Sequence, residues 1–235
     1  MVDRRRFLIG LGTGIAGMSL PVFASLATSC KIIGIGGAGC NLVVALRGSN
    51  ALNQAGAVLD YVCVDLGEHA LQSVEAANAA NPAQTPIKTL MLAPFGAGGR
   101  INTARAVALR QREALQGVVA DADMVILVAG LGGGTGSGIT PIMSRIARIA
   151  GAVTIAAVVT PFDFEGVRME KAARALGYLQ RGADVVLAIS NSKWANRYSN
   201  EASISEVFAG LDQHMAEHLR SAITKLGFQA HLLSL

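Results

Sequence analysis

Two glycine-rich loops contain the residues of this sequence that are best suited to bind an anion. One of them, Gly132–Gly138, reads Gly-Gly-Gly-Thr-Gly-Ser-Gly and follows the apolar run Met124–Val128. Glycines let successive backbone N–H groups approach one anion, and the hydroxyls of Thr135 and Ser137 can add donors. The loop has no lysine, so it is not a P-loop. We expect a di- or triphosphate cradle built from Gly132, Gly133, Gly134, Thr135, Gly136 and Ser137.

The other loop, Gly34–Asn41, lies between the apolar run Lys31–Ile35 and a helix-like segment. Free N–H groups at a helix N-terminus bind phosphate, which makes Gly36, Gly37 and Ala38 candidates for phosphate contacts. The loop also contains the pattern G-x-G-x-x-G, and Asp65 ends the next apolar run, as in NAD-binding domains. This loop alone therefore predicts a nucleotide without fixing which one.

The elements that position these loops alternate along the chain. Short apolar runs, as expected of buried parallel strands, occur at Lys31–Ile35, Val58–Val64, Ile87–Leu92, Met124–Val128, Val153–Val159 and Val185–Ile189. Helix-like segments lie between and after them, at Cys40–Leu46, His69–Ala80, Thr103–Val119, Ile139–Ile149, Glu165–Leu179 and Ser203–Leu226. The alternation predicts an α/β fold, a Rossmann-like three-layer domain over residues 30–235 with a mostly parallel six-stranded sheet. Ligands of such sheets bind at the carboxyl ends of the strands.

The run Gly132–Gly138 resembles the signature of the tubulin/FtsZ family, and the order of elements from Lys31 to Leu226 is similar to that of the family. By this resemblance Asn41 ends the first nucleotide loop. The segment 95–99 is similar to the loop along the γ-phosphate, which would place Gly96, Ala97 and Gly98 there. The resemblance implies GTP or GDP as the ligand, with Mg²⁺ as a cofactor.

The second half of the chain extends the resemblance to the sugar and the base. The segment 161–170 resembles the Pro-Phe-x-Phe-Glu-Gly stretch, so Glu165 would hold the ribose and Arg168 would lie near the sugar or base. Asn191 would hydrogen-bond guanine, and Phe208 and Asp212 would stack on it and hydrogen-bond it. These residue types suit the roles, because a carboxylate accepts from guanine N–H groups and an aromatic ring offers a stacking face.

Departures from the family pattern bear on catalysis. Asp65-Leu66-Gly67 stands where the family has Asn-Thr-Asp, and Arg100 stands where it has Asn. The acidic Asn-x-Asp-x-x-Asp loop, which enters the next subunit's site, and the second domain do not occur up to Leu235. We therefore assign no catalytic residue and expect hydrolysis only in a polymer or with a partner that supplies the acidic loop. The expected partner is a second copy or a full-length FtsZ-like protein, bound head to tail. An NAD(P)-binding oxidoreductase and a non-binding remnant of the family stay open as alternatives.

The N-terminal residues form a separate segment. Arg4-Arg5-Arg6 precedes an apolar stretch that carries no charge before Lys31. This pattern resembles a twin-arginine signal and predicts that residues 1–29 are a signal or membrane anchor, with membrane contact through residues 4–27. GTP is a cytoplasmic nucleotide, so the cytoplasm is the expected location and export is the alternative.

Composition excludes other functions. Hydrophobic residues make up 51% of the sequence and charged residues 15%, which argues against disorder. The sequence has no stripe of basic residues interleaved with aromatic residues, so nucleic acid is not the expected partner. Cys30, Cys40 and Cys63 lack metal-binding spacing. The pattern H-x-x-E-H occurs at residues 214–218, but no third ligand is evident and we predict no protein metal site.

Overall fold

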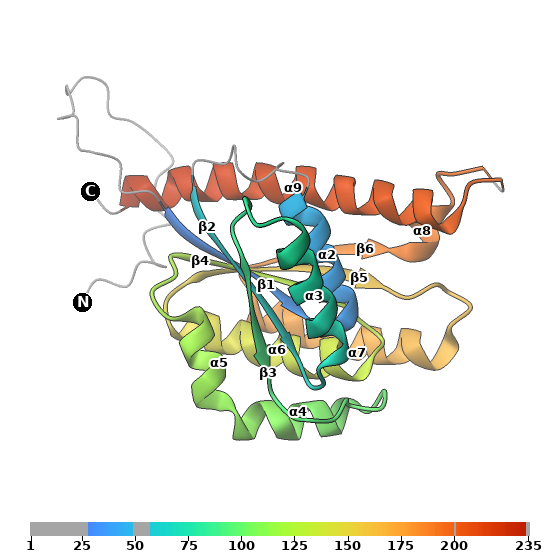
Figure 1. The fold of residues 1–235 in the computed structure, drawn as a ribbon, viewed down its shortest axis with the longest axis horizontal. Helices are drawn as coiled ribbons and strands as arrows, with labels where there is room; N and C mark the ends of the chain where they lie inside the picture. The colour runs from blue at the N-terminus through green and yellow to red at the C-terminus, as the bar shows by residue number, and fades with distance from the viewer. Residues whose placement is uncertain (1–27, 49–56, 200, 234–235) are drawn as a thin grey trace.

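The computed structural model describes residues 28–48, 57–199 and 201–233 (Figure 1). Its strands are β1 (Thr28–Ile35), β2 (Ala57–Asp65), β3 (Ile87–Met91), β4 (Met124–Gly130), β5 (Val153–Thr160) and β6 (Val185–Ser190). Its helices are α2 (Gly36–Gly48), α3 (His69–Ala80), α4 (Ile101–Arg110), α5 (Arg112–Val119), α6 (Gly134–Ile149), α7 (Gly166–Gly182), α8 (Asn191–Ala195) and α9 (Ile204–Leu233). The predicted segment 1–29 lies almost entirely outside the described residues. Among the described helices, none is long and apolar enough to cross a membrane.

The six strands form one sheet in the order β3-β2-β1-β4-β5-β6, and every pair is parallel. In the centre, Ile33 of β1 lies opposite Val62 of β2 and Leu127 of β4. The α/β prediction is confirmed, with a sheet that is parallel throughout. The strand order reverses direction between β1 and β4, so the switch point where such sheets bind ligands lies beyond the ends of these two strands.

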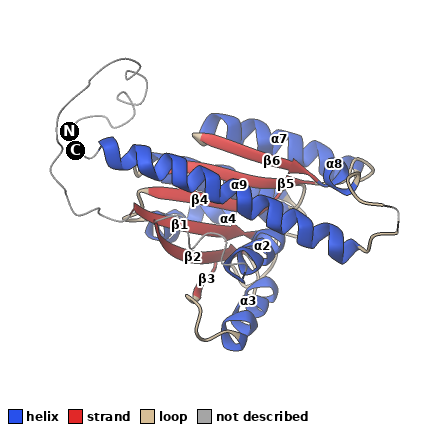
Figure 2. Cartoon of the chain, turned by 90° about the horizontal axis from the view of Figure 1, so that it is seen from above, coloured by secondary structure: helices blue, strands red, loops and turns tan. Residues whose placement is uncertain are grey.

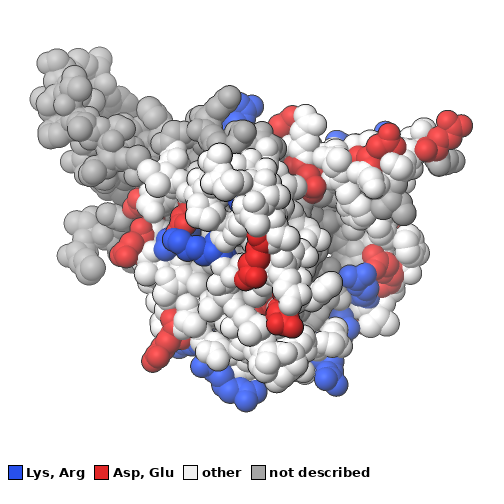
Figure 3. Space-filling model, viewed as in Figure 1, with Lys and Arg blue, Asp and Glu red and all other residues white. Residues whose placement is uncertain are grey.

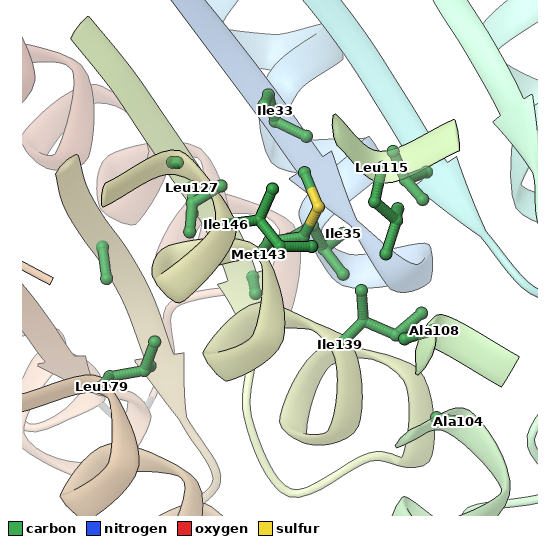
Figure 4. Packing of buried hydrophobic residues seen from close by; sticks show 14 of the residues in the cluster. Ile33, Ile35, Ala104, Ala108, Leu115, Leu127, Ile139, Met143, Ile146 and Leu179 are labelled. Carbon is green, nitrogen blue, oxygen red and sulfur yellow. The ribbon is translucent and has the colours of Figure 1, made fainter. Parts of the chain in front are cut away.

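Helices cover both faces of the sheet, which explains why the central strands are apolar on both sides. Successive residues point to opposite faces, so Ile32 and Ile33 belong to different cores. Beneath the sheet, Ile33, Leu127 and Met143 pack with helices α4 to α7 (Figure 4). Above it, Ile32 packs with α2, α3 and α9, and α9 lies over the sheet in Figure 2. The predicted three-layer architecture is confirmed.

Some element boundaries differ from the sequence prediction. The expected helix Thr103–Val119 is divided into α4 and α5, because Gln111 leaves the helical conformation with ψ 25°. Helices α2 and α6 begin inside the glycine-rich loops, at Gly36 and Gly134, several residues earlier than expected. The first turn of each helix is therefore made of glycine-rich sequence. This brings the first N–H groups of two helices, which have no partner within their own helix, to the switch point.

Candidate functional site

A cavity of about 830 Å³ lies at the carboxyl ends of β1, β4, β5 and β6. Most of the predicted site residues line it together, although they are spread over the whole chain. These are Gly36, Gly37, Ala38, Asn41, Gly133, Gly134, Thr135, Gly136, Glu165, Arg168, Asn191, Phe208 and Asp212. The cavity thus joins the two glycine loops to the start of α7 and to α9.

One end of the cavity is formed by the N-termini of α2 and α6. Gly36 has φ +73°, and a Cβ placed on it would lie 3.2 Å from the backbone nitrogen of Gly136. A Cβ on Gly136 would collide with the carbonyl oxygen of Gly130. The backbone at Gly36 and Gly136 can approach its neighbours this closely only because glycine has no Cβ. The N-cap of α6, Gly133, offers no side chain to its first N–H groups, which therefore suit an anionic ligand.

Two side-chain contacts hold this loop in shape. The backbone N–H of Gly132 donates to Ser137 Oγ at 2.8 Å, and Ser137 is buried behind the cavity rather than lining it. Asp65 accepts from the N–H of Leu66 at 2.7 Å and shares a hydrogen bond with the side chain of Thr135. Burial raises the pKa of Asp65, and these two hydrogen bonds oppose the rise. Asp65 is thus engaged with the glycine loop and does not line the cavity.

At the other end of the cavity, one buried polar atom lacks a hydrogen-bond partner among the described residues. The Oδ1 atom of Asn191 is buried with no hydrogen-bond partner among the described residues. Asp212 is half-buried, and burial raises the pKa of its carboxyl group to about 6. Phe208 is 40% exposed, although it is large and apolar. An unpaired buried acceptor costs free energy, about 1–3 kcal/mol in proteins. A planar ligand with N–H donors would pair both acceptors and cover the ring.

The side wall carries an ion pair at the start of α7. Glu165 accepts from the N–H of Phe162 at 2.9 Å and from a guanidinium nitrogen of Arg168. The side chain of Glu165 is mostly buried, whereas that of Arg168 is exposed. The pair fixes the carboxylate at the cavity wall, where it can accept hydrogen bonds from ligand hydroxyl groups.

Five predicted residues do not line the cavity: Gly96, Ala97, Gly98, Gly132 and Ser137. Ala97 instead lies against the first turn of α6, where a Cβ on Gly134 would come within 2.6 Å of it. Sequence reasoning missed Thr160 and Leu211, which do line the cavity. Thr160 ends β5, so the rule that ligands lie at strand ends could have found it.

The histidines of the H-x-x-E-H pattern lie on α9 and take part in packing. The ring of His214 stacks on Trp194 at 4.6 Å, and its Nε2 lies 3.2 Å from Nε2 of His218. Trp194 Nε1 donates to the carbonyl of Val207 at 2.8 Å, which joins α8 to α9. Within the described ranges, no group of three or more His, Cys, Asp or Glu residues could hold a metal ion.

Two helices that begin in glycine loops at the switch point of a parallel sheet define a Rossmann-like α/β domain, a class in which such helix N-termini commonly face phosphate. A family model, the GTPase domain of the tubulin/FtsZ family, matches residues 29–199. The chain therefore belongs to the tubulin/FtsZ family.

Individual relatives agree with this assignment. The chain is 32% identical over 191 residues to the cell division protein FtsZ of Pseudomonas aeruginosa, covering 81% of the chain and 46% of that protein. Among solved structures, an empty FtsZ dimer from M. jannaschii matches with a TM-score of 0.68 and 27% identity, covering 83% of the chain and 54% of the other. CetZ2 from Haloferax volcanii, a GTPγS-bound protofilament, matches with a TM-score of 0.68 and 29% identity, covering 84% and 58%. The chain spans about half the length of the curated relatives it matches.

Proposed function

We propose that this chain binds GTP and GDP in the cavity of about 830 Å³. One observation carries the proposal: the cavity joins two helix N-termini to Asn191 Oδ1, which is buried with no hydrogen-bond partner among the described residues, and to the half-buried Asp212 carboxylate. Phosphates suit the helix N-termini, and a base with N–H donors suits the two acceptors. The ribose then lies along the wall that carries Glu165 and Arg168.

The carboxylate of Asp212 favours guanine over adenine. Guanine presents N1–H and N2–H₂ as adjacent donors, and an ionised carboxylate accepts from both. Adenine has an acceptor at N1, so its lone pair would point at the carboxylate oxygens, and the two acceptors would repel each other. Phe208 offers an exposed ring for stacking beside this pair.

Asp65 argues against the NAD(P) alternative. In dinucleotide-binding domains the acidic residue at the end of the second strand accepts from the ribose 2′-hydroxyl. Here that carboxylate is engaged by the N–H of Leu66 and by Thr135, outside the cavity lining. Two glycine loops also meet at one cavity, which suits a polyphosphate of one nucleotide.

Mg²⁺ fits this proposal as a companion of the phosphates. The described residues offer no cluster of ligands for a metal ion, and Mg²⁺ at nucleotides is commonly held by phosphate oxygens and water. The segment 95–99 abuts the first turn of α6 through Ala97 and so lies next to the phosphate end. Gly96, Ala97, Gly98 and Arg100 would border the γ-phosphate from that side.

Association with a second copy completes the proposal. Phe164 is 83% exposed at the cavity mouth, and Val167 beside it is also exposed. Exposed apolar side chains around a ligand site favour coverage by another subunit, and a head-to-tail contact repeats. Hydrolysis would then depend on an acidic loop contributed by that subunit.

We also propose that residues 30–235 form one nucleotide-binding domain that works in the cytoplasm, with residues 1–29 as a separate signal or anchor segment.

A thermal melting panel tests ligand choice, because a ligand that binds the native state raises the melting temperature. The full chain would be melted with Mg²⁺ alone and with GDP, GTP, ADP or NAD. The proposal expects a rise with GDP and GTP that grows with ligand concentration, and a much smaller rise with ADP. A rise with NAD alone would support the oxidoreductase instead, and no rise with any nucleotide would support the non-binding remnant.

A further inference from the structure

A second cavity, of about 960 Å³, lies between α4, α6 and α7 on the lower side of the sheet in Figure 1. Its lining holds seven of the chain's 20 Lys and Arg residues and none of its 16 Asp and Glu residues. We call this cavity the basic groove. Its cations are Arg100, Arg105, Arg145, Arg148, Lys171, Arg174 and Arg181. Figure 3 shows Lys and Arg gathered along the lower edge of the molecule, where α4 lies.

Most of these charges form no salt bridge with a described residue. Within the described part of the chain, the guanidinium groups of Arg100, Arg145 and Arg174 make no hydrogen bond or salt bridge, and Lys171 reaches only the carbonyl of Gly99, at 2.9 Å. Arg148 is the exception, since it lies 3.6 Å from Asp184. A hollow lined by one sign of charge focuses its potential and concentrates ions of the other sign.

From this arrangement we propose that the basic groove binds a compact anion carrying several phosphate groups. All but one of its cations are arginines, whose planar fork matches phosphate oxygens in pairs. They come from three helices and converge on one hollow, so a single small polyanion can contact several of them. The volume suits such a ligand, because small-molecule sites span about 300–1,000 Å³.

The lining argues against two larger ligands. Proteins that bind single-stranded nucleic acid offer free aromatic rings for base stacking. The one aromatic residue of the described lining is Tyr178, and the guanidinium groups of Arg105 and Arg181 already lie over its ring, at 5.4 and 5.1 Å. A membrane surface is flat and would meet the rim of a hollow rather than its interior. A compact polyphosphate reaches the cations of all three helices.

The basic groove is separate from the nucleotide cavity but begins next to it. No residue lines both cavities. Lys171 contacts Gly99, and Gly99 and Arg100 pack against Gly134 in the first turn of α6. A test must therefore keep the nucleotide cavity filled, so that a phosphate probe cannot enter it.

The experiment titrates inorganic tripolyphosphate into the full chain saturated with GDP and Mg²⁺, followed by calorimetry. We expect saturable binding that weakens about tenfold or more when ionic strength rises from about 0.05 M to about 0.5 M. The double variant Arg145→Glu, Arg174→Glu should lose about tenfold or more in affinity for tripolyphosphate, because it removes two groove cations and adds two carboxylates. Its GDP affinity should stay unchanged, which also shows that it folds.

The matched control is Arg110→Glu, Arg112→Glu, which makes the same charge change at exposed positions outside the lining. It should change tripolyphosphate affinity by about twofold or less. Equal losses in both variants, or no binding by the wild-type chain, would overturn the proposal. Tighter groove-dependent binding of an oligonucleotide or of anionic vesicles would overturn it in favour of those ligands. If GDP itself fails to bind, the same pair of variants is compared without GDP, so failure of the nucleotide site and failure of the basic groove are told apart.

Discussion

The carboxyl group of Asp212 makes the recognition of guanine depend on pH. Burial raises its pKa to about 6 in the free chain. The ionised form accepts from the two guanine donors, whereas the protonated form presents its own O–H to them. Affinity should therefore rise as pH increases through about 6 and level off above it.

The size of this effect follows from the ionised fraction. A group with a pKa of about 6 is roughly nine-tenths ionised at pH 7 and one-tenth at pH 5. Guanosine should thus bind about tenfold more weakly at pH 5 than at pH 7, or about 1.4 kcal/mol. Guanosine is the better probe, because the phosphates of GDP titrate in the same range. The assay is calorimetric or fluorescence titration at several pH values.

The variant Asp212→Asn separates this carboxyl from other titrating groups. It should bind guanosine weakly and with little change between pH 5 and pH 7.

The same substitution lowers guanosine affinity but should raise the stability of the free chain at neutral pH. The folded-state pKa of Asp212 is raised, so the ionised group opposes folding at neutral pH, and this penalty is lost as pH falls through about 6. The free variant should melt above wild type at pH 7, with the difference vanishing near about pH 4. Guanosine affinity that is constant from pH 5 to pH 7 in wild type would refute this reasoning.

Four further substitutions, one of them a control, test residues in and around the cavity. Asn191→Ala should weaken GDP binding by about 1–2 kcal/mol in titration calorimetry without lowering the melting temperature of the free chain, since its Oδ1 has no partner there; unchanged affinity would remove Asn191 from the site. Gly136→Ala should destabilise the chain by about 1–3 kcal/mol in urea unfolding, because its Cβ would collide with backbone, whereas Gly133→Ala, with open space at its Cβ, should cost far less; equal costs would contradict the close packing. Ser137→Ala should cost about 1–3 kcal/mol by leaving the buried N–H of Gly132 without its acceptor, and an unchanged urea midpoint would argue against that hydrogen bond.

Much of the fold could be predicted because buried parallel strands leave a plain signal. Runs such as Met124–Val128 are apolar on both faces, and glycine loops mark where the helices begin. The order of the strands in the sheet could not be predicted in this way, since it depends on which helices cross which face of the sheet. The division at Gln111 was also missed, because the buried positions continue through it at helical spacing, from Ala108 to Leu115.

The cavity lining was predictable where a residue type has a local pattern and unpredictable where partners come from distant segments. The glycines of Gly132–Gly138 stand out in the sequence as a local pattern, but the hydrogen bond between Gly132 and Ser137 depends on how the loop folds. The contact between Asp65 and Thr135 joins residues far apart in sequence. The basic groove is similar, because its cations come from three helices and form no continuous stripe.

Calorimetric titration of GDP with Mg²⁺ into the full chain, run in parallel with NAD, tests the central claim most directly. The account predicts saturable binding of one GDP per chain, strongly reduced by Asp212→Asn, and no saturable binding of NAD. Saturable NAD binding without GDP binding, or GDP binding unaffected by Asp212→Asn, would contradict it.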